Sequence, residues 1–282
     1  MNSNATFERI TVAQEKILVA LATFKFLTTG QLLDLKVMTD RANINKQLGL
    51  LRNSFKPLIG SIAFGVHPKL GKLESVHYLT AHGALLLQEL YGERYYVRYP
   101  KGKNGLFQQD YFHRIHTIDV HIAFNRWAMA SDMDILFFQT YFDKLSSGRE
   151  KGYRAESAIL ISDKNYLIAD ALCLLSAPRR EELYAIEMYN GNDTNRVHNS
   201  LFAHLQALNN GQPSKQFGLN YGSRVLCVFE FDNYKNLAMK RLSEDKRFAS
   251  AKSYFLFKSL EELGVDDFFD WWLFDGTKGS LF

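Results

Sequence analysis

The stretch YLIADALCLLSAPRREELYAIEMYNG, Tyr166 to Gly191, decides the fold of the second half of this chain. Two apolar runs flank a polar turn, a pattern that predicts two strands joined as a hairpin. Asp170 interrupts the first run and Glu187 the second. Ionised side chains inside apolar strands are costly unless something compensates them, and two neighbouring carboxylates are most simply compensated by a divalent metal. The stretch therefore predicts a Mg²⁺ or Mn²⁺ site at Asp170 and Glu187, and phosphodiester chemistry there.

The whole chain has the composition of a globular, ordered protein. Its 282 residues are 46% hydrophobic, which is enough for two domains with separate cores. Two cysteines, Cys173 and Cys227, lie in apolar runs and are too few for a zinc site or a disulfide framework, so we read both as core residues. The N-terminus has no signal-peptide pattern and no apolar run is long enough to span a membrane, which predicts a cytoplasmic protein without a membrane segment.

A domain boundary is predicted at PKGKNG, Pro100 to Gly105, a cluster of turn-forming and polar residues. The domains expected are therefore residues 1–105 and 106–282. Residues 1–110 contain 14 Lys and Arg against 8 Asp and Glu, whereas residues 111–282 contain 20 against 22. Positive charge is concentrated in the first part, which favours a module there that binds a polyanion.

The first part has the element order of a winged helix-turn-helix. Helices are predicted around Ile17–Phe24, after a cap at Thr29, and after a cap at Asp40. Two strands, residues 60–67 and 73–80, flank the turn PKLGK, and a last helix covers residues 81–90. The helix after Asp40 would enter the DNA major groove while the tip of the strand pair touches phosphates. The residues expected to bind DNA are Arg41, Asn43, Asn45, Lys46, Arg52, Lys69 and Lys72. The alternative is a winged helix used only for protein contacts.

The second part predicts an α/β (α+β) domain with a mixed sheet. A long helix is expected over Tyr111–Ala130, followed by strands at residues 134–143, 156–161, 166–175 and 182–190. A helix at 193–208, a strand at 224–231, a helix at 233–245 and a strand at 253–259 complete the order. Trp271 and Trp272 are expected to pack in the core. The chain has neither a Gly-rich phosphate loop nor a pair of histidines two residues apart.

These motifs resemble a known family. A helix, a strand with a lone Asp in IAD170, and a strand ending in E187-M-Y189 resemble the PD-(D/E)XK restriction-endonuclease-like core. HYLTAHGALLL, His77 to Leu87, is similar to the signature that ends the winged helix in the replication-relaxation family of plasmid proteins, which includes MOBC-type relaxases. The resemblance follows the chain in order over nearly its whole length, through short motifs.

The resemblance implies a role for each matching residue. Asp170 and Glu187 would hold the metal, with Glu156 on the preceding strand as a third carboxylate, and His116 would belong to the helix that opens the second domain. Tyr189 stands where a nuclease has its lysine, so it is a candidate nucleophile for a relaxase. Arg196 would replace the missing positive charge, and Tyr111 and Tyr141 are alternative nucleophiles.

The expected function is binding of duplex origin DNA of a plasmid or mobile element, with nicking of one strand. Expected partners are double-stranded DNA, other mobilisation or replication proteins, and a second copy of the chain in a homodimer. The alternative is a non-enzymatic replication initiator or transcriptional regulator with a degenerate nuclease fold. In that case Asp170 would simply end a strand and Glu187 would pair with Arg179 or Arg180.

Overall fold

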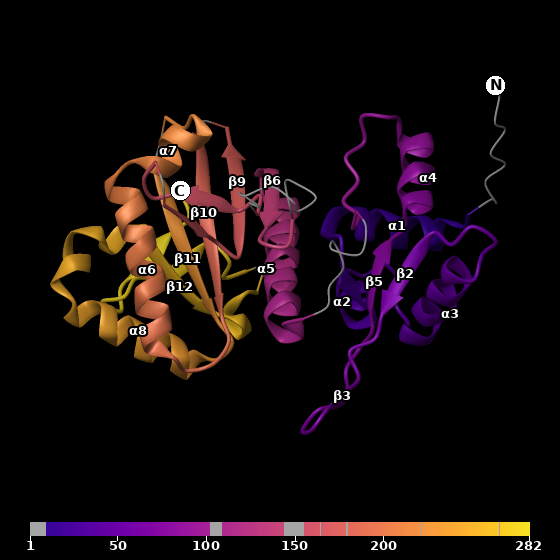
Figure 1. The fold of residues 1–282 in the computed structure, drawn as a ribbon, viewed down its shortest axis with the longest axis horizontal. Coiled ribbons are helices and arrows are strands. Elements are labelled where there is room, and N and C mark those ends of the chain that lie inside the picture. Colours follow the sequence, from indigo (N-terminus) through magenta and orange to yellow (C-terminus); the bar gives the residue numbers. More distant parts are fainter. Residues whose placement is uncertain are drawn as a thin grey trace. The chain divides into compact units, whose positions relative to one another are not determined.

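The chain folds into two compact units, Met1–Tyr111 and Phe112–Phe282 (Figure 1). The computed structural model describes residues 10–101, 109–143, 155–163, 165–178, 180–220, 222–264 and 266–282. The break between the units falls close to the boundary that the sequence predicts after residue 105. Most of the predicted linker, Pro100 to Gly105, lies outside the described residues. No helix in the described part is long and apolar enough to cross a membrane.

Unit 1 is built from helices packed against a small antiparallel sheet. Asp40 caps the third helix as predicted, because its carboxylate accepts hydrogen bonds from the backbone N–H groups of Ala42 and Asn43. Thr28, rather than the predicted Thr29, caps the second helix through a capping box with Gln31. The elements are α1 (Val12–Phe24), β1 (Leu27–Thr28), α2 (Thr29–Asp34), α3 (Arg41–Arg52), β2 (Ile59–Ile62), β3 (Val66–His67), β4 (Gly71–Lys72), β5 (Val76–Leu79) and α4 (Ala81–Tyr91).

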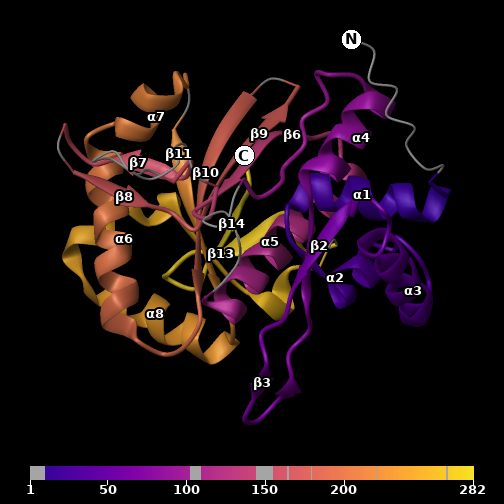
Figure 2. The same ribbon diagram turned by 45° about the vertical axis from the view of Figure 1, so that its right-hand side comes forward.

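A narrow β-hairpin extends from this sheet. The strand predicted at residues 60–67 is divided into β2 and β3, the one at 73–80 is shortened to β5, and β4 lies in the predicted turn. Strands β1, β5 and β2 form one sheet, and β3 and β4 form another. Both ribbon views show the β3–β4 hairpin projecting away from β2 and β5 (Figures 1 and 2). Ile44, Leu48 and Leu51 of α3 are buried, as their helical spacing predicts. The opposite side of α3 is therefore left to polar side chains.

Unit 2 is a seven-stranded mixed sheet covered by helices on both faces, which confirms the mixed α/β class. The strand order is β14-β13-β12-β11-β10-β9-β6; β10, β11 and β12 are parallel and the other pairs antiparallel. The elements around the centre are α5 (Tyr111–Ala130), β6 (Asp134–Thr140), β7 (Ala158–Leu160), β8 (Tyr166–Ile168), β9 (Ala171–Ala177), β10 (Arg180–Tyr189), α6 (Thr194–Asn209) and β11 (Ser223–Phe229). The others are α7 (Gln212–Phe217), α8 (Asp232–Glu244), η2 (Lys246–Tyr254), β12 (Phe255–Ser259), η3 (Leu260–Glu262), β13 (Asp270–Trp272) and β14 (Lys278–Ser280).

Alternation along β10 divides the core into two layers. Leu183 and Ala185 pack with α6 and α8, whereas Tyr184 and Ile186 pack with α5 on the other face. Figure 1 shows the same arrangement, with α5 on one side of the sheet and α6 and α8 on the other. The sequence predicts one strand over 166–175, and this prediction is wrong. The strand is broken, because β8 pairs with β7 in a separate sheet. Trp271 is fully buried among the residues packed under α5, as predicted.

Candidate active site at one end of the central hairpin

Asp170 lies at the joint between β8 and β9, where its carboxylate is held by two donors. Imidazole Nε2 of His113, in the first turn of α5, donates to Asp170 Oδ1 at 2.8 Å. The backbone N–H of Met188 on β10 donates to Asp170 Oδ2, also at 2.8 Å. The backbone N–H of Tyr141 donates to the Asp170 carbonyl at 3.0 Å. The carboxylate is therefore fixed between α5, which covers one face, and β10, an interior strand of the sheet.

Glu187 lies across the hairpin from Asp170. The β9–β10 ladder ends at this side with the pair Ala171 and Ile186, so the next two residues outward are Asp170 and Glu187. Glu187 points to the face covered by α6, where its Oε1 accepts a hydrogen bond from Nε2 of His204 at 2.6 Å. Both side chains of this pair are almost fully buried. Each carboxylate thus has its own imidazole, delivered from opposite faces of the sheet.

The electrostatics of the site show that the two carboxylates affect each other. Burial raises the pKa of Glu187 and the negative charge of Asp170 raises it further, against the opposing effect of His204. Burial lowers the pKa of His113, but the hydrogen bond to Asp170 and its charge outweigh that effect, so the pKa lies above its ordinary value of 6.5. Burial and the nearby charge of Asp170 thus both disfavour the ionised form of Glu187.

A further oxygen donor lies on the same strand. Nδ2 of Asn190, which follows β10, donates to Nδ1 of His116 at 3.1 Å, so the predicted site residue His116 reaches this end of β10 from α5. Asn190 Oδ1 is buried and has no hydrogen-bond partner among the described residues. Two carboxylates and an amide oxygen are the donors that Mg²⁺ and Mn²⁺ prefer, so the chemistry of this set fits a hard divalent cation. Within the described ranges no group of three or more His, Cys, Asp and Glu side chains is gathered tightly enough to hold a metal.

Tyr189 is packed into the core rather than presented at the surface. Its ring contacts Phe229 with 5.0 Å between centroids, and its hydroxyl donates to Ser200 Oγ at 3.2 Å. Burial raises the pKa of Tyr189 well above its ordinary value, and the charge of Glu187 adds to the effect. A phenol in this environment is a poor nucleophile, because the phenolate it would need is strongly disfavoured.

Of the two alternative tyrosines, Tyr141 is next to the carboxylates. Its ring lies 5.5 Å from the ring of His113, and its hydroxyl accepts a hydrogen bond from Nε of Arg114 at 3.1 Å. Tyr111 is the first residue of α5. Arg196, in the first turn of α6, is exposed, and its positive charge lowers the pKa of His113. The role of Arg196 as a substitute for the missing lysine stays a prediction.

Two sequence expectations about the carboxylates need correction. Glu156 lies in the turn before β7 and not on a strand, and its backbone N–H donates to the carbonyl of Asp143 at 2.8 Å. The alternative expectation that Glu187 pairs with Arg180 is also wrong, because the guanidinium of Arg180 pairs with Glu182 at 3.0 Å. Glu187 has His204 instead. The other expected partner, Arg179, lies outside the described residues.

In unit 1, four of the residues predicted to bind DNA line one cleft between α3 and the β4–β5 segment. These are Arg41, Asn45, Arg52 and Lys72. Thr29 Oγ1 donates to Asn45 Oδ1 at 3.0 Å, which orients the amide with its N–H groups away from that bond. The cleft therefore combines three cationic side chains with an oriented amide, the groups that contact phosphates and base edges.

The other three predicted DNA-binding residues lie elsewhere on unit 1. Lys69 is in the turn of the β3–β4 hairpin, where its backbone N–H donates to His67 Nδ1 at 3.3 Å. Lys46 lines a different pocket, on the side of α3 that faces α1 residues. Asn43 is exposed in the first turn of α3. Lys69 thus lies at the hairpin tip as predicted, whereas the residues predicted on α3 are divided between the cleft and other sides of the helix.

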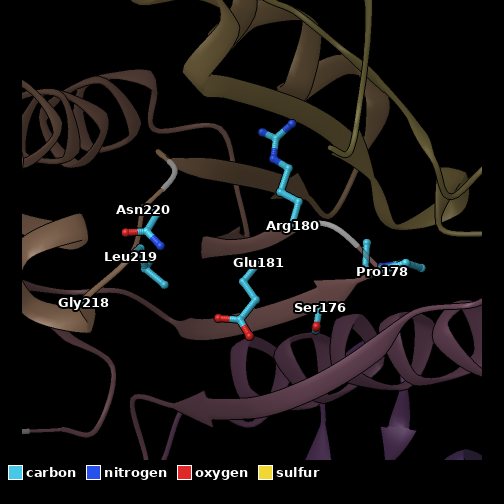
Figure 3. Close-up of a pocket in the computed structure, with 8 residues that line it drawn as sticks. Ser176, Pro178, Arg180, Glu181, Gly218, Leu219 and Asn220 are labelled. Carbon is cyan, nitrogen blue, oxygen red and sulfur yellow. The ribbon is translucent and has the colours of Figure 1, made fainter.

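A separate polar pocket lies at the far end of the central hairpin (Figure 3). Ser176, Arg180 and Glu181 line it near the β9–β10 turn, and Gly218 and Asn220 line it from the segment after α7. Asp170 and Glu187 are at the opposite ends of these two strands. The pocket is therefore separate from the carboxylate pair.

Sequence reasoning missed the two imidazoles that hold the carboxylates. The signal was present in the helical spacing, because His113 precedes Thr117 and Val120 on the buried stripe of α5, and His204 follows Val197 and Leu201 on that of α6. A histidine on an apolar helix face needs a buried partner. Which carboxylate provides it depends on the packing of helix against sheet.

The chain matches no protein-family model, and comparisons with curated proteins and with solved structures also find no match.

Proposed function

We propose that this chain binds duplex DNA of a plasmid or mobile element through a winged helix in unit 1 and nicks one strand at a PD-(D/E)XK-like site in unit 2. The observation that carries the proposal is the placement of Asp170 and Glu187 opposite each other at one end of the β9–β10 hairpin, where burial and then the charge of Asp170 raise the pKa of Glu187. A divalent cation would relieve that repulsion. The basic cleft of unit 1 supports the DNA-binding half of the proposal.

The roles of the residues follow from their contacts. Asp170 and Glu187 would hold Mg²⁺ or Mn²⁺, with Asn190 Oδ1 as a further oxygen donor. When bound, such an ion supplies charge stabilisation at the scissile phosphate and lowers the pKa of a coordinated water. His113 and His204 orient the two carboxylates. Arg196 supplies the positive charge that the lysine provides in the resembling nucleases.

Hydrolysis fits these contacts better than attack by Tyr189. In hydrolysis a water oxygen forms the new bond to phosphorus and one phosphodiester P–O bond breaks. The attacking water gives up its protons to solvent, and the departing deoxyribose oxygen takes up a proton from solvent. The buried hydroxyl of Tyr189 is committed to Ser200 and its pKa is raised, so it is not prepared to form a tyrosyl phosphodiester. The product expected is a nicked strand free of protein.

Nicking of a supercoiled plasmid that carries its own origin tests the proposal. The full chain with Mn²⁺ should convert it to open circles, and D170N or E187Q should lose this activity while keeping duplex binding. Glu181→Gln is the matched control, since Glu181 is an exposed carboxylate on the same strand as Glu187, at the other end (Figure 3). Nicking that survives in D170N and E187Q would exclude these residues as the site.

A second candidate is a non-enzymatic DNA-binding protein. This candidate is favoured because Asp170 and Glu187 each already have a histidine as hydrogen-bond donor. The same experiment separates the two candidates, because a retired site would bind duplex DNA without nicking it at any Mn²⁺ concentration. Arg52→Ala should weaken DNA binding under either candidate, since Arg52 lines the basic cleft.

A further inference from the structure

The basic cleft of unit 1 contains an acid of its own. Among the described residues that line the cleft, Glu74 is the one acid beside Arg41, Arg52 and Lys72. Its carboxylate pairs with the guanidinium of Arg41. Glu74 lies two residues before the start of β5 and Arg41 begins α3, so the pair joins the two sides of the cleft.

The backbone holds Glu74 in that position. The N–H of Gly30 donates to Glu74 Oε2 at 2.9 Å. A Cβ at Gly30 would lie 3.3 Å from Oε2 and 3.4 Å from Oε1, so the absence of a side chain allows the carboxylate to approach this closely. The orientation of Glu74 toward Arg41 is thus built into the fold and is not a chance contact of two long side chains.

The pair is exposed enough to be exchanged. The side chain of Arg41 is 48% exposed and that of Glu74 is 34% exposed. Ion pairs at this level of exposure change an equilibrium constant by no more than about fivefold. A DNA phosphate is also an anion, and it makes bidentate hydrogen bonds with a guanidinium as a carboxylate does. A phosphate can therefore replace Glu74 at Arg41 at modest cost.

We propose that Glu74 competes with the DNA backbone for Arg41, so that this acid restrains the affinity of the cleft for duplex DNA of any sequence. The proposal rests on the proposed function, since it assumes that this cleft is the DNA-binding surface. It assigns to Glu74 a role in setting overall affinity: any duplex whose phosphate contacts Arg41 must first break an internal ion pair, so the affinities for all sequences fall together.

Glu74→Gln tests the proposal in the full chain. The substitution removes the charge but keeps an amide oxygen that can accept from the Gly30 N–H. Affinity for a fluorescent duplex of random sequence, measured by anisotropy over a series of salt concentrations, should rise by up to about fivefold. The slope of log affinity against log salt should steepen by about one, because Arg41 becomes available for one more phosphate.

Two controls keep the result specific. Glu89→Gln makes the same charge change at an exposed position of α4 and should alter affinity much less. In an Arg41→Gln background, Glu74→Gln should give no more than the Glu89→Gln effect, because the proposed competitor acts through Arg41. Thermal melts verify that every variant is folded.

The outcomes separate this proposal from the proposed function. If wild type binds the duplex and Glu74→Gln does not bind more tightly, or if the gain persists without Arg41, the competition is disproved while DNA binding stands. If neither wild type nor Glu74→Gln binds duplex DNA at low salt, both proposals are wrong.

Discussion

The two units hold their charges in opposite ways. The cleft of unit 1 places Arg41 and Glu74 in a pair that is partly open to solvent. The end of the hairpin in unit 2 buries Glu187 against His204, with both side chains less than a tenth exposed. Exposed charges are screened by water and exchange partners easily, whereas buried charges are fixed by the groups around them. The comparison teaches that the first surface is suited to capture a mobile polyanion and the second to hold groups in one geometry.

The largest effect on stability is expected when the buried pair of Glu187 and His204 is broken. His204→Ala would leave Glu187 buried without its hydrogen-bond donor, and loss of one partner of such a pair costs about 3 kcal/mol in the free energy of unfolding. Urea denaturation followed by tryptophan fluorescence measures it, because Trp127, Trp271 and Trp272 all belong to unit 2. Glu74→Gln in unit 1 provides the contrast, followed by circular dichroism because all three tryptophans are in unit 2, with less than about 1 kcal/mol expected for an exposed pair. Equal losses would contradict the comparison.

A smaller effect is expected from pH in unit 1. His77 is buried beside the cleft, and burial followed by the charge of Arg52 lowers its pKa from 6.5 to about 4. Because the native pKa lies below the unfolded value, the unfolded state binds the proton first, and stability falls as pH falls from 6.5 toward 4. The expected loss between pH 7 and pH 5 is about 2 kcal/mol.

Circular dichroism measures that loss, since it includes unit 1 while tryptophan fluorescence does not. In His77→Gln, the part of the acid-induced loss that belongs to unit 1 should disappear. A variant as sensitive to acid as wild type would show that the burial of His77 does not control the stability of this unit.

The smallest effect expected is at Tyr189. Tyr189→Phe removes the hydroxyl that donates to Ser200 and leaves the ring in place, so unit 2 should lose about 1 kcal/mol. Nicking should be unchanged, because the proposed reaction uses water. If the variant keeps its stability but loses nicking, the phenol of Tyr189 takes part in the reaction.

Much of the architecture follows from local pattern. The bounds predicted for the helix Tyr111–Ala130 are those observed. Asp40 caps α3 as N-cap preferences predict, and the buried residues of α3 are those that the helical spacing of its apolar residues predicts. The β9–β10 hairpin follows from two apolar runs around a polar turn. These features depend on residues close in sequence, so one sequence is sufficient to predict them.

The partners in the site could not be predicted in this way. Asp170 and His113 are 57 residues apart, and Glu187 and His204 are 17 apart on a strand and a helix. The sequence shows that the carboxylates need compensation, but it does not show whether an imidazole, an arginine or a metal provides it. The break between β8 and β9 was missed for a related reason, because apolar residues resume directly after Asp170 while the pairing partner changes from β7 to β6 and β10.

That break at Ala169 and Asp170 also bears on how this protein can vary. The β7–β8 hairpin forms its own sheet, and the register of the central hairpin begins only at Ala171. An insertion or deletion in the β7–β8 turn would therefore be absorbed within two short strands, without a shift of Ala171 against Ile186. The chain can change length on one side of Asp170 while the carboxylate pair keeps its geometry, which makes this turn a natural position for lineage-specific insertions and for engineered ones.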